Sequence, residues 1–165
     1  MAKITLAISL LFSLVLLTTA CKSTKNTDGM ADYLTPHEFK GKILSFGSGG
    51  GFTGAVDQYT LMEDGQLFQG AHKEGNVQVY DKLDKQLTEQ MFNNYFTLGF
   101  DDRVMDNPGN MYYFIKMKDG DQTHKLTWGG YGDEKPEPLH QYLMTLYKLA
   151  KRTASSEGGV PSARK

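Results

Sequence analysis

Residues 111–128 read MYYFIKMKDGDQTHKLTW and carry the clearest fold signal in the 165-residue chain. Two runs of alternating apolar and polar residues flank Asp119-Gly120, a dipeptide typical of two-residue β-hairpin turns. A turn there pairs Lys118 with Asp121 and fixes the register of both strands. The sequence therefore predicts a hairpin with one mostly apolar face toward the core, made of residues 111, 113, 115, 117, 122, 124, 126 and 128.

Strand and helix signals alternate through the rest of the region around this hairpin. A helix is expected from Leu83, with apolar residues four apart, an N-cap at Asp84 or Asp81 and an end at Gly99. A second helix is expected from Pro138, with an apolar stripe along it. Further strands are expected at residues 42–46, 52–63, 66–70 and 76–80. The sequence predicts an α+β domain: an antiparallel sheet of about five or six strands built from hairpins, with two helices on one face.

The start of the chain has the layout of a bacterial secretory signal. Lys3 precedes an almost wholly apolar run over residues 4–17, and Ala20 stands directly before Cys21. The Ala20-Cys21 step resembles the lipobox of bacterial lipoproteins, which implies that Cys21 is acylated after the preceding peptide is removed. Two or more acyl chains hold a protein stably on a membrane. Because Lys22 follows the cysteine, the resemblance also implies the outer membrane. A secreted protein with a free thiol and an uncleaved anchor are the alternatives.

Composition divides the chain beyond this signal. Small polar residues dominate residues 22–36, and Ser, Gly, Pro, Arg and Lys dominate the last stretch. Neither stretch holds enough apolar surface to fold alone. We predict a signal peptide at 1–20, a flexible tether at 21–36, a single domain at 37–152 and a disordered tail at 153–165.

Charge and cysteine content exclude several classes of function. With 18 Lys+Arg against 19 Asp+Glu, the formal net charge is -1, which argues against nucleic acid as a partner. One cysteine excludes an internal disulfide framework and a Cys-rich zinc site. We interpret the basic residues near the C-terminus as complementing the dipole of the last helix, with a phosphate-attracting patch as the alternative. These residues are Lys148, Lys151, Arg152, Arg164 and Lys165, against Glu157.

A glycine run, GSGGGFTG at residues 47–54, matches the spacing G-x-G-x-x-G. The residues that follow it favour a strand, whereas a dinucleotide site needs a helix to open there, so we exclude a dinucleotide cofactor and expect no cofactor of any kind. Two interpretations remain: a tight connection between strands, or a loop that contacts a partner. The candidate contact residues of the loop are Gly49, Gly50, Gly51, Phe52 and Thr53.

The remaining polar residues give no catalytic motif, and the sequence is therefore predicted not to be an enzyme. His124 falls on the apolar face of the hairpin, where we expect a hydrogen-bonded histidine or one at the rim of the core rather than a metal ligand. Asp101, Asp102 and Asp106 precede Asn107 in a stretch that either forms ordinary turns or cradles Ca²⁺. We expect turns, with no metal bound.

Four segments together resemble emfourin, a small inhibitor of thermolysin-type metallopeptidases. They read GGGFTG at 49–54, YFTL at 95–98, NPGNMYY at 107–113 and THKL at 123–126. The resemblance implies that loops at one end of the sheet occlude a peptidase cleft. A tight inhibitor needs an ordered backbone before it binds, so a triple glycine suits this role only where packing clamps it. The chain departs from the family by a second strand pair within 61–80 and a longer loop at 129–137.

A second interpretation has a different partner. An accessory or structural lipoprotein would dock onto a protein complex of the outer membrane through an aromatic surface of Tyr112, Phe114 and Tyr131. In both interpretations the partners are a membrane, reached through the lipid on Cys21, and a protein.

Overall fold

The computed structural model describes residues 34–70, 77–129 and 136–156. Cys21 and Tyr131 lie outside these residues, as do the predicted signal peptide and most of the predicted tether and tail. All described residues belong to one unit of the chain, Leu34–Lys165. In the part that the structure describes, no helix is both long and apolar enough to cross a membrane.

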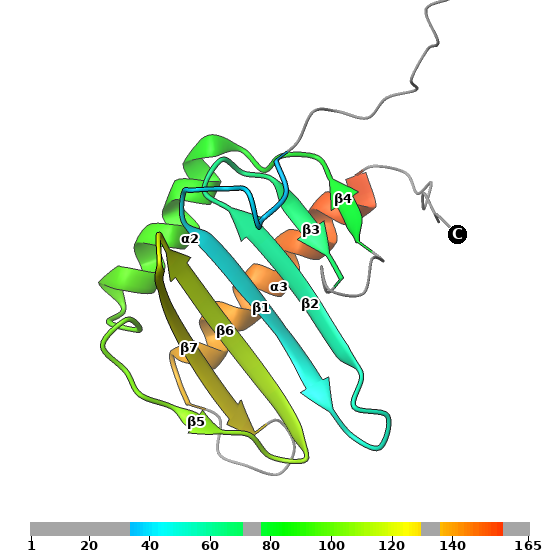
Figure 1. Ribbon diagram of the computed structural model, residues 1–165, viewed down its shortest axis with the longest axis vertical. Coiled ribbons are helices and arrows are strands. Elements are labelled where there is room, and N and C mark those ends of the chain that lie inside the picture. Colours follow the sequence, from blue (N-terminus) through cyan, green and yellow to red (C-terminus); the bar gives the residue numbers. More distant parts are fainter. Residues whose placement is uncertain (1–33, 71–76, 130–135, 157–165) are drawn as a thin grey trace, which may run out of the picture. The chain divides into compact units, whose positions relative to one another are not determined.

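Seven strands form one sheet, and two helices accompany it (Figure 1). The predicted α+β class is confirmed, although the sheet is larger than the expected five or six strands. The elements are β1 (Ile43–Gly50), β2 (Val56–Met62), β3 (Leu67–Gln69), β4 (Gln78–Tyr80), α2 (Lys85–Thr97), β5 (Asp106–Asn107), β6 (Met111–Asp119), β7 (Gln122–Gly129) and α3 (Leu139–Ser156).

The strand order is β4-β3-β2-β1-β6-β7-β5. All neighbours are antiparallel except β5 and β7, which run parallel. The central strand β1 pairs with β2, its successor in sequence, and also with β6, which comes after α2. The sheet is therefore mixed and is not a simple succession of hairpins.

The hairpin of β6 and β7 keeps the predicted faces in a different register. Lys118 pairs with Thr123, and Asp119 pairs with Gln122, so the turn residues are Gly120 and Asp121 rather than Asp119 and Gly120. Gly120 has a φ of 57°, a conformation that glycine adopts without strain. Because the register differs from the prediction by two residues, every side chain stays on its expected face.

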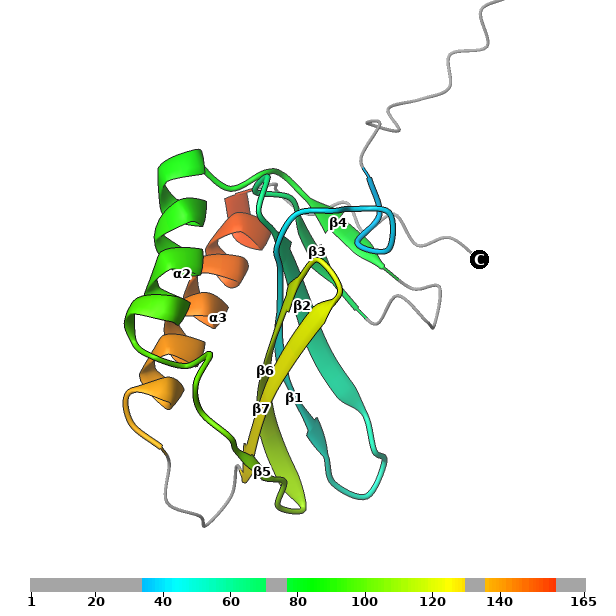
Figure 2. The ribbon, with the colours of Figure 1, turned by 60° about the vertical axis from the view of Figure 1, so that its left-hand side comes forward.

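Both helices lie on the same side of the sheet (Figure 2). α2 begins where predicted, because the Asp84 side chain accepts a hydrogen bond of 3.1 Å from the backbone N–H of Leu87. The Tyr142 hydroxyl of α3 donates to the backbone carbonyl of Met91 in α2 at 2.7 Å and ties the two helices together. α3 continues to Ser156, four residues beyond the predicted end of the domain at residue 152. The predicted apolar stripe of α3 enters the core at Leu139, Tyr142, Leu143, Leu146 and Ala150.

The opposite face of the sheet carries the first described segment, residues 34–42, over one end (Figure 2). The segment is ordered by a turn in which the Thr35 hydroxyl donates to a Glu38 carboxylate oxygen at 2.7 Å. At its end, Lys42 forms a 3.0 Å ion pair with Glu63 and holds the start of β1 against the end of β2.

The two ends of the sheet differ, and we name them by what they carry. We call one end the hairpin end, after the hairpin of β1 and β2. It holds the β1–β2 connection, residues 51–55, and the β5–β6 connection, residues 108–110 (Figure 1). The Leu34 end, opposite to it, holds Leu34 and the C-terminal end of α3 in both views. Any surface at the hairpin end therefore lies a full strand length away from the point where the preceding chain joins the domain.

Candidate protein-binding site at the hairpin end

The glycine run begins inside the sheet, because β1 continues to Gly50 instead of ending at Phe46 as predicted. The neighbouring strand β6 supplies the reason. A Cβ atom on Gly49 would lie 2.6 Å from the Tyr112 hydroxyl, and one on Gly47 would lie 2.9 Å from ring carbons of Phe114. The two aromatic rings fill the space that side chains would take on β1, so glycine is the residue that allows this approach.

The connection after β1 is clamped to the connection before β6. The backbone N–H of Gly51 donates to the carbonyl oxygen of Asn110 at 2.8 Å, and the N–H of Gly54 donates back to the Gly51 carbonyl oxygen at 3.2 Å. Gly50 and Gly51 have φ values of 102° and 72°, which glycine adopts without strain. The triple glycine is thus held by backbone hydrogen bonds on both sides, which meets the condition that an inhibitory loop must satisfy.

Three exposed apolar side chains lie at this clamped end of the sheet. Phe52 has a relative exposure of 108%, and Val56 and Met111 have 44% and 42%. The Val56 residue pairs with Gly49, and Met111 pairs with Gly50, so the two strands that flank β1 place these side chains beside the tip. Exposed aromatic and methionine side chains at an ordered tip are the residue types that protein interfaces favour.

The predicted contact residues fall into three groups. Gly49, Gly50, Gly51, Phe52 and Thr53 come together with half-buried Tyr112 at the hairpin end. Phe114 does not join this surface, because it is 5% exposed and the Lys125 ammonium lies 5.6 Å from its ring centroid. The prediction that Phe114 offers an exposed contact is therefore wrong. Tyr131 lies outside the described residues.

Sequence reasoning did not identify Val56, Met111 and Asn110 as members of the site. Met111 was expected to face the core with the rest of its hairpin face, but it stays exposed at the start of β6. The Gly50–Met111 pairing joins residues far apart in the chain, so no local pattern shows it. The one local signal is Pro108-Gly109, which marks a turn directly before Asn110.

His124 is a partly buried, hydrogen-bonded histidine, which is the first of the two predicted roles. Its Nε2 lies 2.7 Å from the Arg103 carbonyl oxygen, and its Nδ1 lies 2.6 Å from the Tyr95 hydroxyl. Because a carbonyl oxygen only accepts, Nε2 donates to it, and in that tautomer Nδ1 accepts from the Tyr95 hydroxyl. Burial raises the pKa of Tyr95, which keeps this hydroxyl protonated as a donor. The network joins α2 to β7, and this structural role is sufficient to explain the position of His124.

The three acidic residues considered for Ca²⁺ do not form a cluster. Asp106 belongs to β5 and pairs with Thr127, while Asp101 and Asp102 lie in the exposed turn after α2. Among the described residues, no group of three or more His, Cys, Asp or Glu side chains is placed to hold a metal ion. The arrangement favours turn formation as the role of these carboxylates.

Comparison with known proteins adds no relative. No protein-family model matches the chain, and no curated protein matches it. The geometry of the hairpin end and the sequence around Cys21 are therefore the features that bear on function.

Proposed function

We propose that this chain is a lipid-anchored binding module of the bacterial outer membrane that contacts a protein partner through its hairpin end. Two observations support the proposal. The sequence around Cys21 has the order of charged, apolar and small residues that lipoprotein signals need. The hairpin end presents apolar side chains on a backbone that hydrogen bonds hold in place.

The observation that carries the proposal is the position of Phe52. A phenylalanine exposed at 108% gains nothing for folding, since its ring contacts no core. Burying such a ring against a partner contributes about 1.5–3 kcal/mol from apolar area alone. Because the loop beneath it is already ordered, little conformational entropy is lost on binding. The tip therefore has the properties of an interface anchor.

A peptidase cleft is the partner site that we favour. A narrow tip on a rigid strand pair suits insertion into a cleft, and the resemblance to emfourin implies the same mode of action. We propose binding rather than catalysis as the activity, because the hairpin end presents an exposed aromatic side chain on a backbone that hydrogen bonds hold in place.

The test adds residues 34–165 to a panel of thermolysin-type peptidases. This segment is suited to the purpose because every buried hydrophobic residue described lies between Ile43 and Ala150. We expect inhibition by the unaltered segment and a loss of at least about tenfold in affinity for Phe52→Ala, as for a central interface aromatic. Val104→Ala is the matched control, since Val104 is 97% exposed but lies before β5. Equal inhibition by both variants would contradict the assignment of the tip.

The alternative is an accessory lipoprotein that docks onto an outer-membrane protein complex. Val56 of β2 and Met111 of β6 favour it, because they flank the tip on opposite faces of the sheet and together offer a wider contact than one inserted loop. Affinity capture of the intact lipoprotein in mild detergent should then retain the complex, with retention lost in Phe52→Ala. No inhibition across the peptidase panel together with such capture would select this alternative.

The anchor has its own test. Mass spectrometry of the chain extracted from membranes should find Cys21 as the first residue, with the added mass of acyl chains, and Cys21→Ser should release the protein from the membrane fraction. A bare thiol, or a chain that still begins at Met1, would remove the anchor from the proposal and leave the hairpin end to be judged separately.

A further inference from the structure

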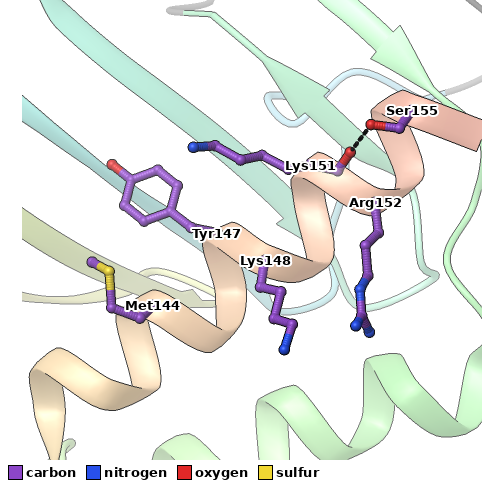
Figure 3. A pocket seen from close by; sticks show the side chains of 6 residues that line it. All are labelled: Met144, Tyr147, Lys148, Lys151, Arg152 and Ser155. Carbon is purple, nitrogen blue, oxygen red and sulfur yellow. Dashed lines mark hydrogen bonds between the residues drawn. The ribbon is translucent and has the colours of Figure 1, made fainter.

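An open groove of about 720 Å³ runs along the outer side of α3. Its lining combines cations with an exposed methionine and the ring of a tyrosine (Figure 3). The lining residues are Met144, Tyr147, Lys148, Lys151, Arg152 and Ser155. In Figure 3 the Lys148 and Arg152 side chains extend to one side of the helix, and Lys151 extends to the other side with Tyr147.

Within the part of the chain that the structure describes, the cations of this groove form no ion pair. α3 contains no Asp or Glu over its whole length. The ion pairs found within the described residues involve Lys42, Lys82 and Lys85, and none of them involves a cation of α3. Lys151 instead lies with its ammonium 5.9 Å from the centroid of the Tyr147 ring. Among the described residues, the groove is thus a positive surface without ion pairs, on a chain whose net charge is -1.

The helix dipole does not account for these charges. Stabilisation of cations by the dipole falls off within the last helical turn. Because α3 runs to Ser156, its last turn contains no basic residue, and the interpretation of these cations as dipole partners is wrong. Their placement therefore points to a ligand with negative charge.

The groove lies toward the Leu34 end of the domain, where the chain leading from Cys21 joins (Figures 1 and 2). Cys21 precedes Leu34 by 13 residues. A segment of this length spans at most about 45 Å when fully extended, and about 20 Å as a random coil. An acylated Cys21 would therefore keep the groove within reach of the bilayer surface.

We propose that the α3 groove binds anionic phospholipid headgroups of the membrane that carries the anchor. The inference rests on the anchor of the proposed function but concerns a different surface from the hairpin end. Lys148, Lys151 and Arg152 would contact the phosphates, while their aliphatic stems and Met144 contact the upper acyl region. The domain then rests on the membrane with α3, and the hairpin end extends away from it.

The experiment uses residues 34–165, which carry no acyl chain. Sedimentation with vesicles of phosphatidylcholine, with and without one quarter phosphatidylglycerol, measures the partition coefficient at low salt. We expect binding to the anionic vesicles alone. The triple variant Lys148→Gln, Lys151→Gln and Arg152→Gln should weaken it by about 100-fold, at about fivefold per cation. Raised salt should weaken the binding of the unaltered segment in the same direction.

The matched control removes the same charge elsewhere. Lys40→Gln, Lys118→Gln and Lys125→Gln lie on the segment and strands opposite the helices and should change the partition coefficient by less than about threefold, since their effect is only through long-range charge. Equal losses in both triples, or no loss in the α3 triple, would overturn the proposal. Equal affinity for soluble polyglutamate would overturn it as well, because the groove would then select acidic polypeptides. Failure of acylation at Cys21 changes none of these measurements, so the two proposals fail separately.

Discussion

The substitution Gly50→Ala tests whether the hairpin end is clamped. Gly50 has a φ of 102°, outside the range that L-residues ordinarily adopt. A Cβ atom there would overlap the carbonyl oxygen of Asn110, a backbone atom that cannot rotate away. The same carbonyl accepts the 2.8 Å hydrogen bond from Gly51, so relief of the overlap breaks the clamp.

The loss of stability can be worked out from these contacts. The strained backbone costs about 1–3 kcal/mol. The lost hydrogen bond adds about 1 kcal/mol, for a total of about 2–4 kcal/mol. Gly54→Ala is the matched control, because Gly54 has a φ of 62° and a Cβ there would meet no atom within 4 Å. It should cost about 1 kcal/mol, from the left-handed conformation alone.

Guanidinium unfolding of residues 34–165 measures both losses. The chain has one tryptophan, Trp128, which is 3% exposed and reports unfolding by fluorescence. In thermal unfolding each kcal/mol should lower Tm by about 4 °C for a domain of this size. Equal losses for Gly50→Ala and Gly54→Ala would refute the clamp, and with it the argument that the tip is ordered before binding.

Three further outcomes follow from side-chain hydrogen bonds and titration. Tyr95→Phe leaves Nδ1 of His124 without its 2.6 Å donor and should cost about 1–3 kcal/mol in denaturant unfolding; an unchanged midpoint would contradict the network. Burial, and after it the charge of Asp57, raises the pKa of Tyr59 to about 12. The hydroxyl of Tyr59 therefore ionises at lower pH in the unfolded chain than in the folded one, and the free energy of unfolding should fall as pH rises from about 10 to about 12. Absorbance at 295 nm follows the ionisation. The backbone N–H of Lys42 lowers the pKa of Glu63, so this group stabilises the fold above its unfolded pKa and loses that effect as pH falls through the lower folded value. Glu63→Gln should flatten the acid limb of stability against pH and cost less than about 1 kcal/mol at neutral pH, since the pair is exposed; an unchanged acid limb would contradict this.

The sequence predicts the faces of the elements better than their pairing. Alternation places Ile115 and Leu126 on the core face, and both are fully buried. The observed turn residues lie one position after the predicted ones, because Asp119-Gly120 and Gly120-Asp121 both suit a two-residue turn. Only the pairing of β6 with β1, which spans most of the domain, selects between such alternatives.

The site was predicted in part for a related reason. The run of glycines marks a special backbone, and Phe52 beside it marks the tip. Whether the glycines form a loop or a strand depends on Tyr112 and Phe114, whose rings cover Gly49 and Gly47 from a distant part of the chain. The same contact buries Phe114, which local sequence had suggested as an exposed residue. The packing of these two rings on β1 thus explains both differences from the prediction: β1 is longer than expected, and Phe114 is not part of the contact surface.

The two edge strands of the sheet are short. β4 has three residues and β5 has two, so each edge strand itself offers few backbone groups to another sheet, and β5 covers β7 only at Thr127 and Trp128. Proteins confined to a bilayer surface collide far more often, and in fewer orientations, than proteins free in solution. Short edge strands of this kind would limit edge-to-edge pairing between copies that crowd together on a membrane.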